Sequence, residues 1–239
     1  MPGRKRIGLI CAVPLEGKTV RSAMANRRIS GRFATGEIGK SSVVHTASGI
    51  GMANAAGATV ELILRFKPSV LIIFGIGGAY PGSGLNLGDL ALATSEIYAD
   101  LGVAGKAGFK GLKALGFGVL TKGPETFYNE IPLAPALVRR SNRLFPGIVS
   151  GPFATVNQAT GTTKKARELR RRYKAVCENM EGAAAAHMAL AHGVRALEIR
   201  GISNIVEDRD LKKWDRDSAA QRVQEAVVEL CRFSRLNGF

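Results

Sequence analysis

Two stretches of this chain are nearly continuous runs of apolar residues, and they constrain its fold more than any other feature. Ile7 to Val13 and Val70 to Phe74 show none of the polar alternation of a half-exposed strand. Strands that are apolar on both faces occupy central positions in a sheet that is covered on either side. The sequence therefore predicts an α/β fold in which a sheet lies between two helical layers.

Helix and turn signals alternate with these strands. The turn from Ser48 to Gly51 opens an expected helix from Met52 to Phe66, which Pro68 ends. Small apolar residues from Ala183 to Leu190 predict a buried helix that Gly193 stops. Further strands are expected at 33–38, 43–47, 90–93, 96–98, 148–156 and 197–204, and further helices at 18–26, 132–143, 162–173 and 218–233, with an irregular connection at 106–116. No repeat or linker interrupts this alternation, so we expect one domain spanning 1–239.

Basic residues outnumber acidic ones, 34 Lys and Arg against 19 Asp and Glu, and the formal net charge is +15. Such an excess is typical of proteins that bind nucleic acids. The basic residues, however, fall in separate short stretches, and apart from Tyr173 no aromatic residue interleaves with them to form a stacking surface for bases. We therefore expect a solvated basic surface, which can also steer a carboxylated substrate, and no nucleic-acid partner.

The sequence has the features of a cytoplasmic protein. Its 46% hydrophobic and 22% charged residues are ordinary for a domain that folds in water. Arg4 to Arg6 followed by Ile7 to Val13 resembles the start of a signal peptide, but the apolar run is too short and a strand is the better interpretation. No run is long enough to span a bilayer. The cysteines (Cys11, Cys177, Cys231) and histidines (His45, His187, His192) lack metal-ligand or triad spacing, so we expect reduced thiols, structural imidazoles and no metal.

Polar residues occur where the expected strands and helices reach one edge of the sheet. Glu181 stands at the start of the buried Ala-rich helix, and Asn204 at the end of an apolar strand. A buried carboxylate is costly unless it binds something, and α/β sheets bind ligands at the carboxyl ends of their strands. Glu16, in the first loop, is a third candidate, although each of the three also has a structural explanation as a helix-dipole carboxylate or a turn former. Glu198 and Arg200 share one side of their strand and predict a buried ion pair.

Four stretches, residues 7–16, 45–51, 74–89 and 178–204, resemble the purine nucleoside phosphorylase and nucleosidase superfamily. Within it, three motifs are similar to those of the futalosine hydrolase family, which are nucleosidases of the futalosine route to menaquinone. The motifs are Gly75-Ile-Gly-Gly-Ala-Tyr-Pro-Gly-Ser-Gly84, Glu178-Asn-Met-Glu-Gly182 and Arg200-Gly-Ile-Ser-Asn204, the last followed by Arg209, Asp210 and Trp214. The resemblance implies a three-layer α/β/α fold with a mixed, mostly parallel central sheet, hydrolysis of an N-glycosidic bond, and no cofactor.

The resemblance also implies roles for individual residues. Glu16 corresponds to the carboxylate that activates water, Glu181 to the glutamate that holds the ribose hydroxyls, and Asn204 to the residue that contacts the leaving purine. Arg200 is expected to orient a carboxylate of the site from behind. The other substrate contacts are expected from Met180, Thr155, Val156, Ile76 and Gly77.

The residue types at particular positions separate substrates and reactions. Adenine-releasing relatives carry Asp where this chain has Asn204, whereas an amide can donate to N7 or O6 of a 6-oxopurine such as hypoxanthine, the base of futalosine. Phosphorylases of the superfamily bind phosphate through an Arg and a hydroxyl at the positions of Ile73 and Ile76, so water is the expected nucleophile.

We accordingly expect futalosine to be hydrolysed to hypoxanthine and dehypoxanthine futalosine. The alternatives are a methylthioadenosine/S-adenosylhomocysteine or aminodeoxyfutalosine nucleosidase and a purine nucleoside phosphorylase. Members of the superfamily are commonly oligomers, so we expect a homo-oligomer, a dimer or higher. Basic and aromatic residues between Lys106 and Tyr128 are the candidates for binding the carboxylated 5′ group, and Glu207 stands where the resemblance implies a glycine.

Overall fold

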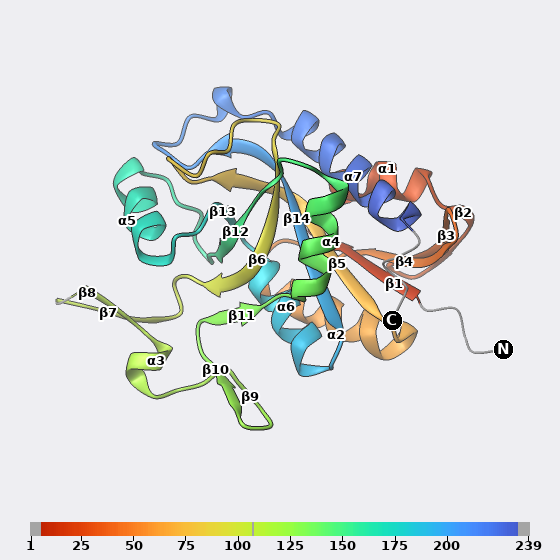
Figure 1. Ribbon diagram of the computed structural model, residues 1–239. Coiled ribbons are helices and arrows are strands. Elements are labelled where there is room, and N and C mark those ends of the chain that lie inside the picture. Colours follow the sequence, from red (N-terminus) through yellow and green to blue (C-terminus); the bar gives the residue numbers. More distant parts are fainter. Residues whose placement is uncertain (1–5, 107, 234–239) are drawn as a thin grey trace.

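The computed structural model describes residues 6–106 and 108–233, which form one mixed 10-stranded sheet with helices on both faces (Figure 1). The order of neighbouring strands is β11-β6-β12-β13-β5-β1-β4-β3-β2, and β14 pairs with both β5 and β6. These strands are β1 (Arg6–Cys11), β2 (Ala25–Ser30), β3 (Phe33–Ile38), β4 (Ser41–Ala47), β5 (Val70–Ala79), β6 (Leu90–Tyr98), β11 (Glu130–Pro132), β12 (Val149–Thr155), β13 (Cys177–Asn179) and β14 (Arg195–Ile205).

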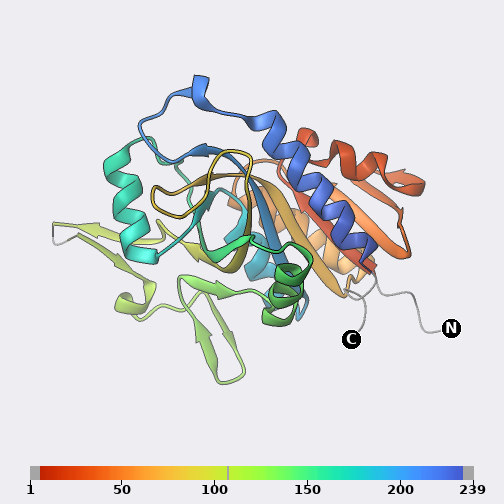
Figure 2. The ribbon, with the colours of Figure 1, turned by 45° about the horizontal axis from the view of Figure 1, so that its top comes forward.

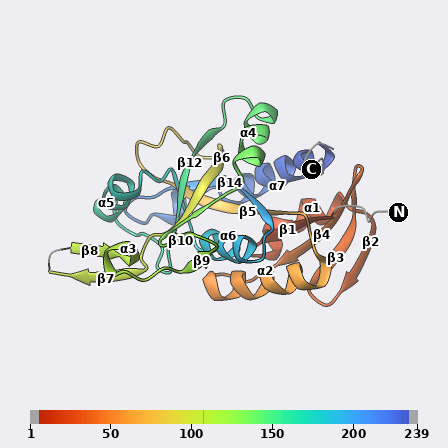
Figure 3. The ribbon, with the colours of Figure 1, turned by 60° about the horizontal axis from the view of Figure 1, so that its bottom comes forward.

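Helices cover the sheet on either side, which confirms the predicted three-layer architecture. Figure 3 shows α2 and α6 below the sheet and α7 and α4 above it. The helices are α1 (Lys18–Ser22), α2 (Met52–Phe66), α3 (Leu112–Leu115), α4 (Pro135–Leu144), α5 (Thr163–Tyr173), α6 (Gly182–Ala191) and α7 (Arg216–Arg232), with 3-10 turns η1 (Pro14–Gly17) and η2 (Leu211–Lys213). The segment that contains β7 (Gly102–Gly105), β8 (Gly108–Gly111), α3, β9 (Leu120–Lys122) and β10 (Glu125–Phe127) projects from this body.

The apolar runs of β1 and β5 explain the three layers. Ile7 and Leu9 pack with Phe74 in one hydrophobic cluster, whereas Ile10 and Ile73 belong to a second cluster on the opposite face. Successive side chains of a strand point to opposite faces, so both faces of these strands are buried. In Figure 2, α7 lies across the strands whose side chains form the first cluster.

The pairing of the strands is mixed, as the resemblance implied, with parallel pairs at the centre and also between β12 and its neighbours β6 and β13. β1 runs parallel to β4 and β5, and β14 parallel to β5. Antiparallel pairs link β2 to β3, β3 to β4 and β11 to β6, and also join β13 to β5 and β14 to β6. The parallel centre brings the carboxyl ends of β1, β5 and β14 to one edge of the sheet.

The structure corrects several expected boundaries. The strand expected from Val70 to Phe74 is longer, because β5 continues through the following glycines to Ala79 between β14 and β13. A Cβ atom at Gly77 would lie 2.5 Å from the sulfur of Cys177, so glycine here permits close strand packing. The first helix ends at Ser22 rather than Asn26, since Ala25–Ser30 pairs with β3 as β2. The connection at 106–116 contains part of a hairpin and α3 rather than irregular chain.

Other expectations hold closely. The helix Met52–Phe66 has the predicted ends, and Thr162 caps α5 by accepting a hydrogen bond from the backbone N–H of Lys165. Helix α7 begins earlier than expected because Asp215 caps it through the N–H of Ser218. Among the described residues, no helix has the length and apolar character needed to cross a membrane.

Candidate active site

A cavity of about 400 Å³ opens where the parallel strands β1, β5 and β14 end. It is lined by backbone and side chains that follow or end these strands and by the residues that lead into α6. This is the edge of an α/β sheet at which ligands bind. Of the site residues predicted from sequence, Glu16, Ile76, Gly77, Met180, Glu181 and Asn204 line it.

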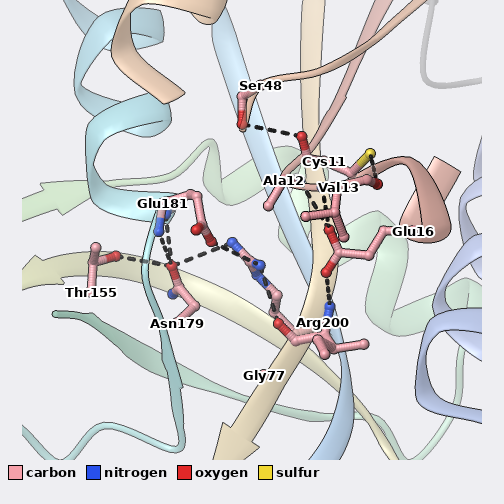
Figure 4. A network of polar contacts seen from close by, with 12 residues as sticks. Cys11, Ala12, Val13, Glu16, Ser48, Gly77, Thr155, Asn179, Glu181 and Arg200 are labelled. Atoms are coloured by element: carbon pink, nitrogen blue, oxygen red, sulfur yellow. Dashed lines mark hydrogen bonds and ion pairs between the residues drawn. The ribbon is translucent and has the colours of Figure 1, made fainter. Parts of the chain in front are cut away.

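The carboxylate of Glu16 is held almost entirely by backbone N–H groups. Its Oε2 accepts hydrogen bonds from Ala12 (2.9 Å) and Val13 (3.1 Å), and its Oε1 accepts one from Ile76 (2.8 Å). Burial raises the pKa of Glu16 above its usual range, against the opposing effects of Arg200 and of these N–H donors. A Cβ atom at Gly75 would lie 2.6 Å from Oε1, so only glycine leaves room for this carboxylate. Figure 4 shows Glu16 facing the Arg200 side of the site.

Glu181 is fixed at both its backbone and its side chain. Its N–H donates to Oδ1 of Asn179 (2.9 Å), and its Oε1 accepts from the N–H of Gly51 (2.9 Å), which comes from the loop before α2. Its Oε2 lies 3.7 Å from Nη1 of Arg200. The carboxylate is therefore oriented but not saturated, and its oxygens can still accept from ligand hydroxyls.

Asn204 presents an oriented amide to the cavity. The hydroxyl of Ser203 donates to its Oδ1 (2.9 Å), and its Nδ2 donates to the backbone oxygen of Ile205 (3.1 Å). An amide nitrogen carries two hydrogens, so one remains for a ligand acceptor. Gly78 accommodates this side chain, because a Cβ atom there would lie 3.1 Å from Nδ2.

A buried polar network supports these residues, and Figure 4 shows its members Arg200, Asn179 and Thr155 near Glu181. Arg200 donates from Nε to Glu198 (2.8 Å) and from Nη2 to Oδ1 of Asn179 (3.3 Å), so the predicted pair with Glu198 is present. Asn179 donates in turn from Nδ2 to Oε1 of Glu96 (2.6 Å), and the hydroxyl of Thr155 donates to Oε2 of Glu96 (2.6 Å). Arg200 thus connects the carboxylate of Glu181 to this buried network.

Glu96 and Glu198 are two carboxyl groups buried close together beneath the site. Both are completely buried, and burial is the first cause that raises the pKa of each, followed for Glu96 by the charge of Glu198. For Glu198, the Arg200 guanidinium opposes the rise in pKa. Gly182 is packed against both groups, because a Cβ atom there would lie 2.6 Å from either oxygen of Glu198.

Comparison with known proteins agrees with this architecture. Residues 6–235 match the model of a family described as the phosphorylase superfamily. The chain belongs to the phosphorylase superfamily. Futalosine hydrolase from Thermus thermophilus is 37% identical over 187 residues, which cover 78% of this chain and 80% of the relative. The futalosine hydrolase of Streptomyces coelicolor is 35% identical over 190 residues, 77% of this chain and 76% of the relative.

A second group of superfamily relatives covers more of the chain at lower identity. The 5′-methylthioadenosine/S-adenosylhomocysteine nucleosidase of Halalkalibacterium halodurans is 28% identical over 236 residues, 97% of this chain and 99% of the relative. The crystal structure of the nucleosidase of that name from Neisseria meningitidis, in complex with methylthio-immucillin-A, has a TM-score of 0.80 at 25% identity and covers 95% of this chain and 99% of its own. Relatives of both groups are nucleosidases, which are N-glycosyl hydrolases, and this superfamily member is an enzyme of that class.

Two predicted substrate contacts lie elsewhere. Thr155 and Val156 are buried and are not among the described residues that line the cavity. Thr155 instead joins the supporting network, where its hydroxyl accepts a hydrogen bond from the N–H of Ala183 (2.8 Å) and donates to Glu96. The parallel pairing of β12 with β13 explains this placement, because it directs Thr155 toward Asn179 beneath α6. Ala159 and Thr160, further along the same segment, line the cavity.

Several residues that line or support this cavity were not predicted from the sequence. Asn179 and Glu96 lie far apart in the chain, and only the pairing of β6 with β12 and of β12 with β13 joins them. Glu178, which lines the cavity, accepts hydrogen bonds from the hydroxyls of Tyr80 (2.6 Å) and Thr160 (2.6 Å). Glu178 could have been proposed from the sequence, because it is a second carboxylate in the strand before α6.

Glu207, which stands where the resemblance implied a glycine, forms an exposed ion pair with Lys213 (3.1 Å).

Proposed function

We propose that this superfamily member hydrolyses the N-glycosidic bond of a 6-oxopurine nucleoside, and that its substrate is futalosine, which yields hypoxanthine and dehypoxanthine futalosine on the route to menaquinone. The observation that carries the proposal is the convergence of two carboxylates and one carboxamide, those of Glu16, Glu181 and Asn204, on one cavity. The identity of 37% to the futalosine hydrolase of Thermus thermophilus supports the choice of substrate.

Glu16 is the general base in the proposed mechanism. Cleavage by water passes through an oxocarbenium-like sugar, so water needs a group that accepts its proton as it attacks C1′. Because burial raises the pKa of Glu16, its affinity for that proton exceeds that of an exposed glutamate. The bond from C1′ to N9 breaks, its electron pair leaves with the purine, and the proton of the attacking water passes to Glu16.

Glu181 and Asn204 hold the two parts that separate. The carboxylate of Glu181 accepts hydrogen bonds from the vicinal ribose hydroxyls, with its other contacts to Gly51 and Arg200 keeping it in place. The unoccupied N–H of Asn204 donates to N7 or O6 of the purine and stabilises its developing negative charge. An acceptor-only carboxylate in that position cannot stabilise an oxopurine anion in this way.

Water rather than phosphate is the proposed nucleophile. Ile73 is buried in the hydrophobic core, and Ile76 contributes an apolar side chain and a backbone N–H that Glu16 already accepts. A phosphate bound here would be repelled by the carboxylate of Glu16. Positions 73 and 76 would supply neither an Arg nor a hydroxyl to offset that repulsion, so phosphate binding is unfavourable. No cofactor and no metal take part in the proposed chemistry.

We also propose a homo-oligomer that works in the cytoplasm. Phe117 is 69% exposed and Val103 50% exposed, and both lie on the projecting segment, which is a surface that another copy can cover. Cys11, Cys177 and Cys231 are free thiols, as is usual in a reducing compartment. Light scattering on the purified protein measures the assembly, and a monomer at working concentration would refute it.

The proposed reaction is tested by measuring base release from futalosine, inosine and methylthioadenosine, each with and without inorganic phosphate, by chromatography. We expect hypoxanthine from futalosine at a rate that phosphate does not change. Adenine release from methylthioadenosine with none from futalosine would favour the second group of relatives, and dependence on phosphate would establish a phosphorylase.

A further inference from the structure

Solvent-accessible residues at the start of α7 and in the loop before it also line the cavity and form its mouth. Arg209, Trp214 and Arg216 line this part. The start of α7 is fixed in place, since the N–H of Asp215 donates to the backbone oxygen of Ser203 (2.8 Å). Gln224, further along α7, donates to the backbone oxygen of Leu15 (3.2 Å), which ties the helix to η1. These two contacts tie α7 to the strand that carries Asn204 and to the turn that carries Glu16.

The mouth carries two guanidinium groups that form no ion pair with any described residue. Arg209 and Arg216 are the only Lys or Arg residues of the described chain that line the cavity, and neither forms a hydrogen bond or ion pair with another described residue. The guanidinium of Arg209 lies 5.0 Å from the centre of the Trp214 ring, a cation–π contact that fixes its position. Guanidinium groups at the entrance of a cavity, without a carboxylate partner, are suited to bind a ligand anion.

The acidic residues of the same loop are occupied elsewhere. Glu207 pairs with Lys213, and Asp208 accepts from the N–H and hydroxyl of Thr163. Asp210 and Asp215 accept from backbone N–H groups at the starts of η2 and α7. The carboxylates inside the cavity are likewise engaged by their own hydrogen-bond donors: Glu16 by Ala12, Val13 and Ile76, Glu178 by Tyr80 and Thr160, and Glu181 by Gly51.

Two exposed apolar side chains line the same cavity. Leu15 is 49% exposed and Ile50 is 60% exposed, and both line the same cavity as Arg216. Large apolar residues left open beside unpaired guanidinium groups fit a ligand whose apolar part ends in an anion.

We propose that Arg216, together with Arg209 stacked on Trp214, binds a carboxylate at the far end of the nucleoside's 5′ substituent, while Leu15 and Ile50 contact the apolar part of that substituent. The proposal rests on the proposed function: with the purine at Asn204 and the ribose diol at Glu181, the 5′ carbon is the remaining point from which the substrate extends. It replaces the sequence-based candidates at 106–128, because none of the described residues in that range lines the cavity.

A carboxylate and a phosphate share the chemistry that a guanidinium recognises, so the experiment separates them. Base release is measured for futalosine, its methyl ester, inosine and inosine 5′-monophosphate, with the wild type, Arg216→Met and Arg222→Met. Arg222 is an exposed arginine of the same helix that does not line this cavity, which makes it a matched control. Thermal unfolding of each variant establishes that it is folded.

We expect the ratio of kcat/KM for futalosine to that for its methyl ester to fall about tenfold in Arg216→Met and to stay at the wild-type value in Arg222→Met. An unchanged ratio in Arg216→Met overturns the proposal. A loss of preference for inosine 5′-monophosphate over inosine, with the futalosine ratio unchanged, assigns the residue to a phosphate and also overturns it.

Measurements of ligand affinity test this proposal independently of the proposed reaction. Calorimetric titration of the Glu16→Gln variant, with and without Arg216→Met, compares futalosine and its methyl ester without turnover. If the wild type releases no base from futalosine, the proposed function fails, but the binding preference for the free acid still decides the role of Arg216. Loss of that preference in the double variant supports the subsite. If the double variant keeps the preference, or if Glu16→Gln alone shows none, the subsite is refuted.

Discussion

Arg200 and Glu198 form a fully buried ion pair, with Nε of the guanidinium 2.8 Å from Oε1 of the carboxylate. The same guanidinium lies 3.7 Å from Oε2 of Glu181, which lines the cavity. Arg200 therefore connects a charge in the core to a charge that faces the ligand. Its neighbours also raise its own pKa, because the carboxylates of Glu198, Glu181 and Glu16 outweigh the effect of burial.

Replacing Arg200 by Met should destabilise the protein by about 3–5 kcal/mol, because it leaves the buried carboxylate of Glu198 without its counter-ion. Urea denaturation measures the change. Arg222→Met, an exposed arginine on α7, should change the free energy of unfolding by less than about 0.5 kcal/mol. Equal effects of the two substitutions would contradict the structural role of the Arg200 pair.

Glu16→Gln should lower kcat for base release by about 10²–10⁴-fold, since the amide cannot take the proton of the attacking water. Substrate affinity, measured by calorimetry, should change much less. Glu61→Gln, an exposed carboxylate paired with Arg65, is the control and should keep wild-type activity. Turnover close to wild type in Glu16→Gln would remove this residue from the role of general base.

Asn204→Asp should impair hypoxanthine release, because an ionised carboxylate repels the purine anion that the amide N–H stabilises. The test compares kcat/KM for hypoxanthine release from futalosine with that for adenine release from methylthioadenosine. We expect the first to fall and the second to rise or stay level. Unchanged hypoxanthine release would show that the amide does not select the purine.

Gly75→Ala should reduce activity, because the added Cβ lies 2.6 Å from Oε1 of Glu16 and 3.0 Å from Nη1 of Arg200. Gly57→Ala is the matched control, since a Cβ at this exposed position in α2 meets no atom within 4 Å. It should raise the free energy of unfolding by about 0.5–1 kcal/mol through helix propensity and leave base release unchanged. Equal activity in both variants would exclude a steric requirement for glycine at position 75.

Glu96→Gln should change how stability depends on pH. Burial, and then the charge of Glu198, raise the pKa of Glu96 well above its usual 4.5, so above that pH the folded protein binds more protons than the unfolded chain. This stabilising effect is complete below about pH 4.5 and is lost as the pH rises through the folded-state pKa. The variant has no such proton, so its free energy of unfolding should fall less steeply toward alkaline pH. Parallel pH profiles would contradict a raised pKa of Glu96 in the folded protein.

The sequence by itself determined the layers of this protein and the residue types at its site. The apolar runs of β1 and β5 are long enough to require cover on both faces, and their ends place Glu16 and Ile76 at one edge of the sheet. The pair of Glu198 and Arg200 followed from the period of two along a strand. These features depend on short stretches of chain, which is why pattern alone predicts them.

Only the tertiary structure decided what supports and surrounds that site. Asn179, Glu96 and Thr155 come from separate strands, and only strand pairing makes them one hydrogen-bonded network. Arg216 joined the cavity because Asp215 bonds to Ser203, a contact that no local pattern predicts. Burial, hydrogen-bond partners and pKa depend on residues brought together from distant parts of the chain, and a linear pattern does not contain those distances.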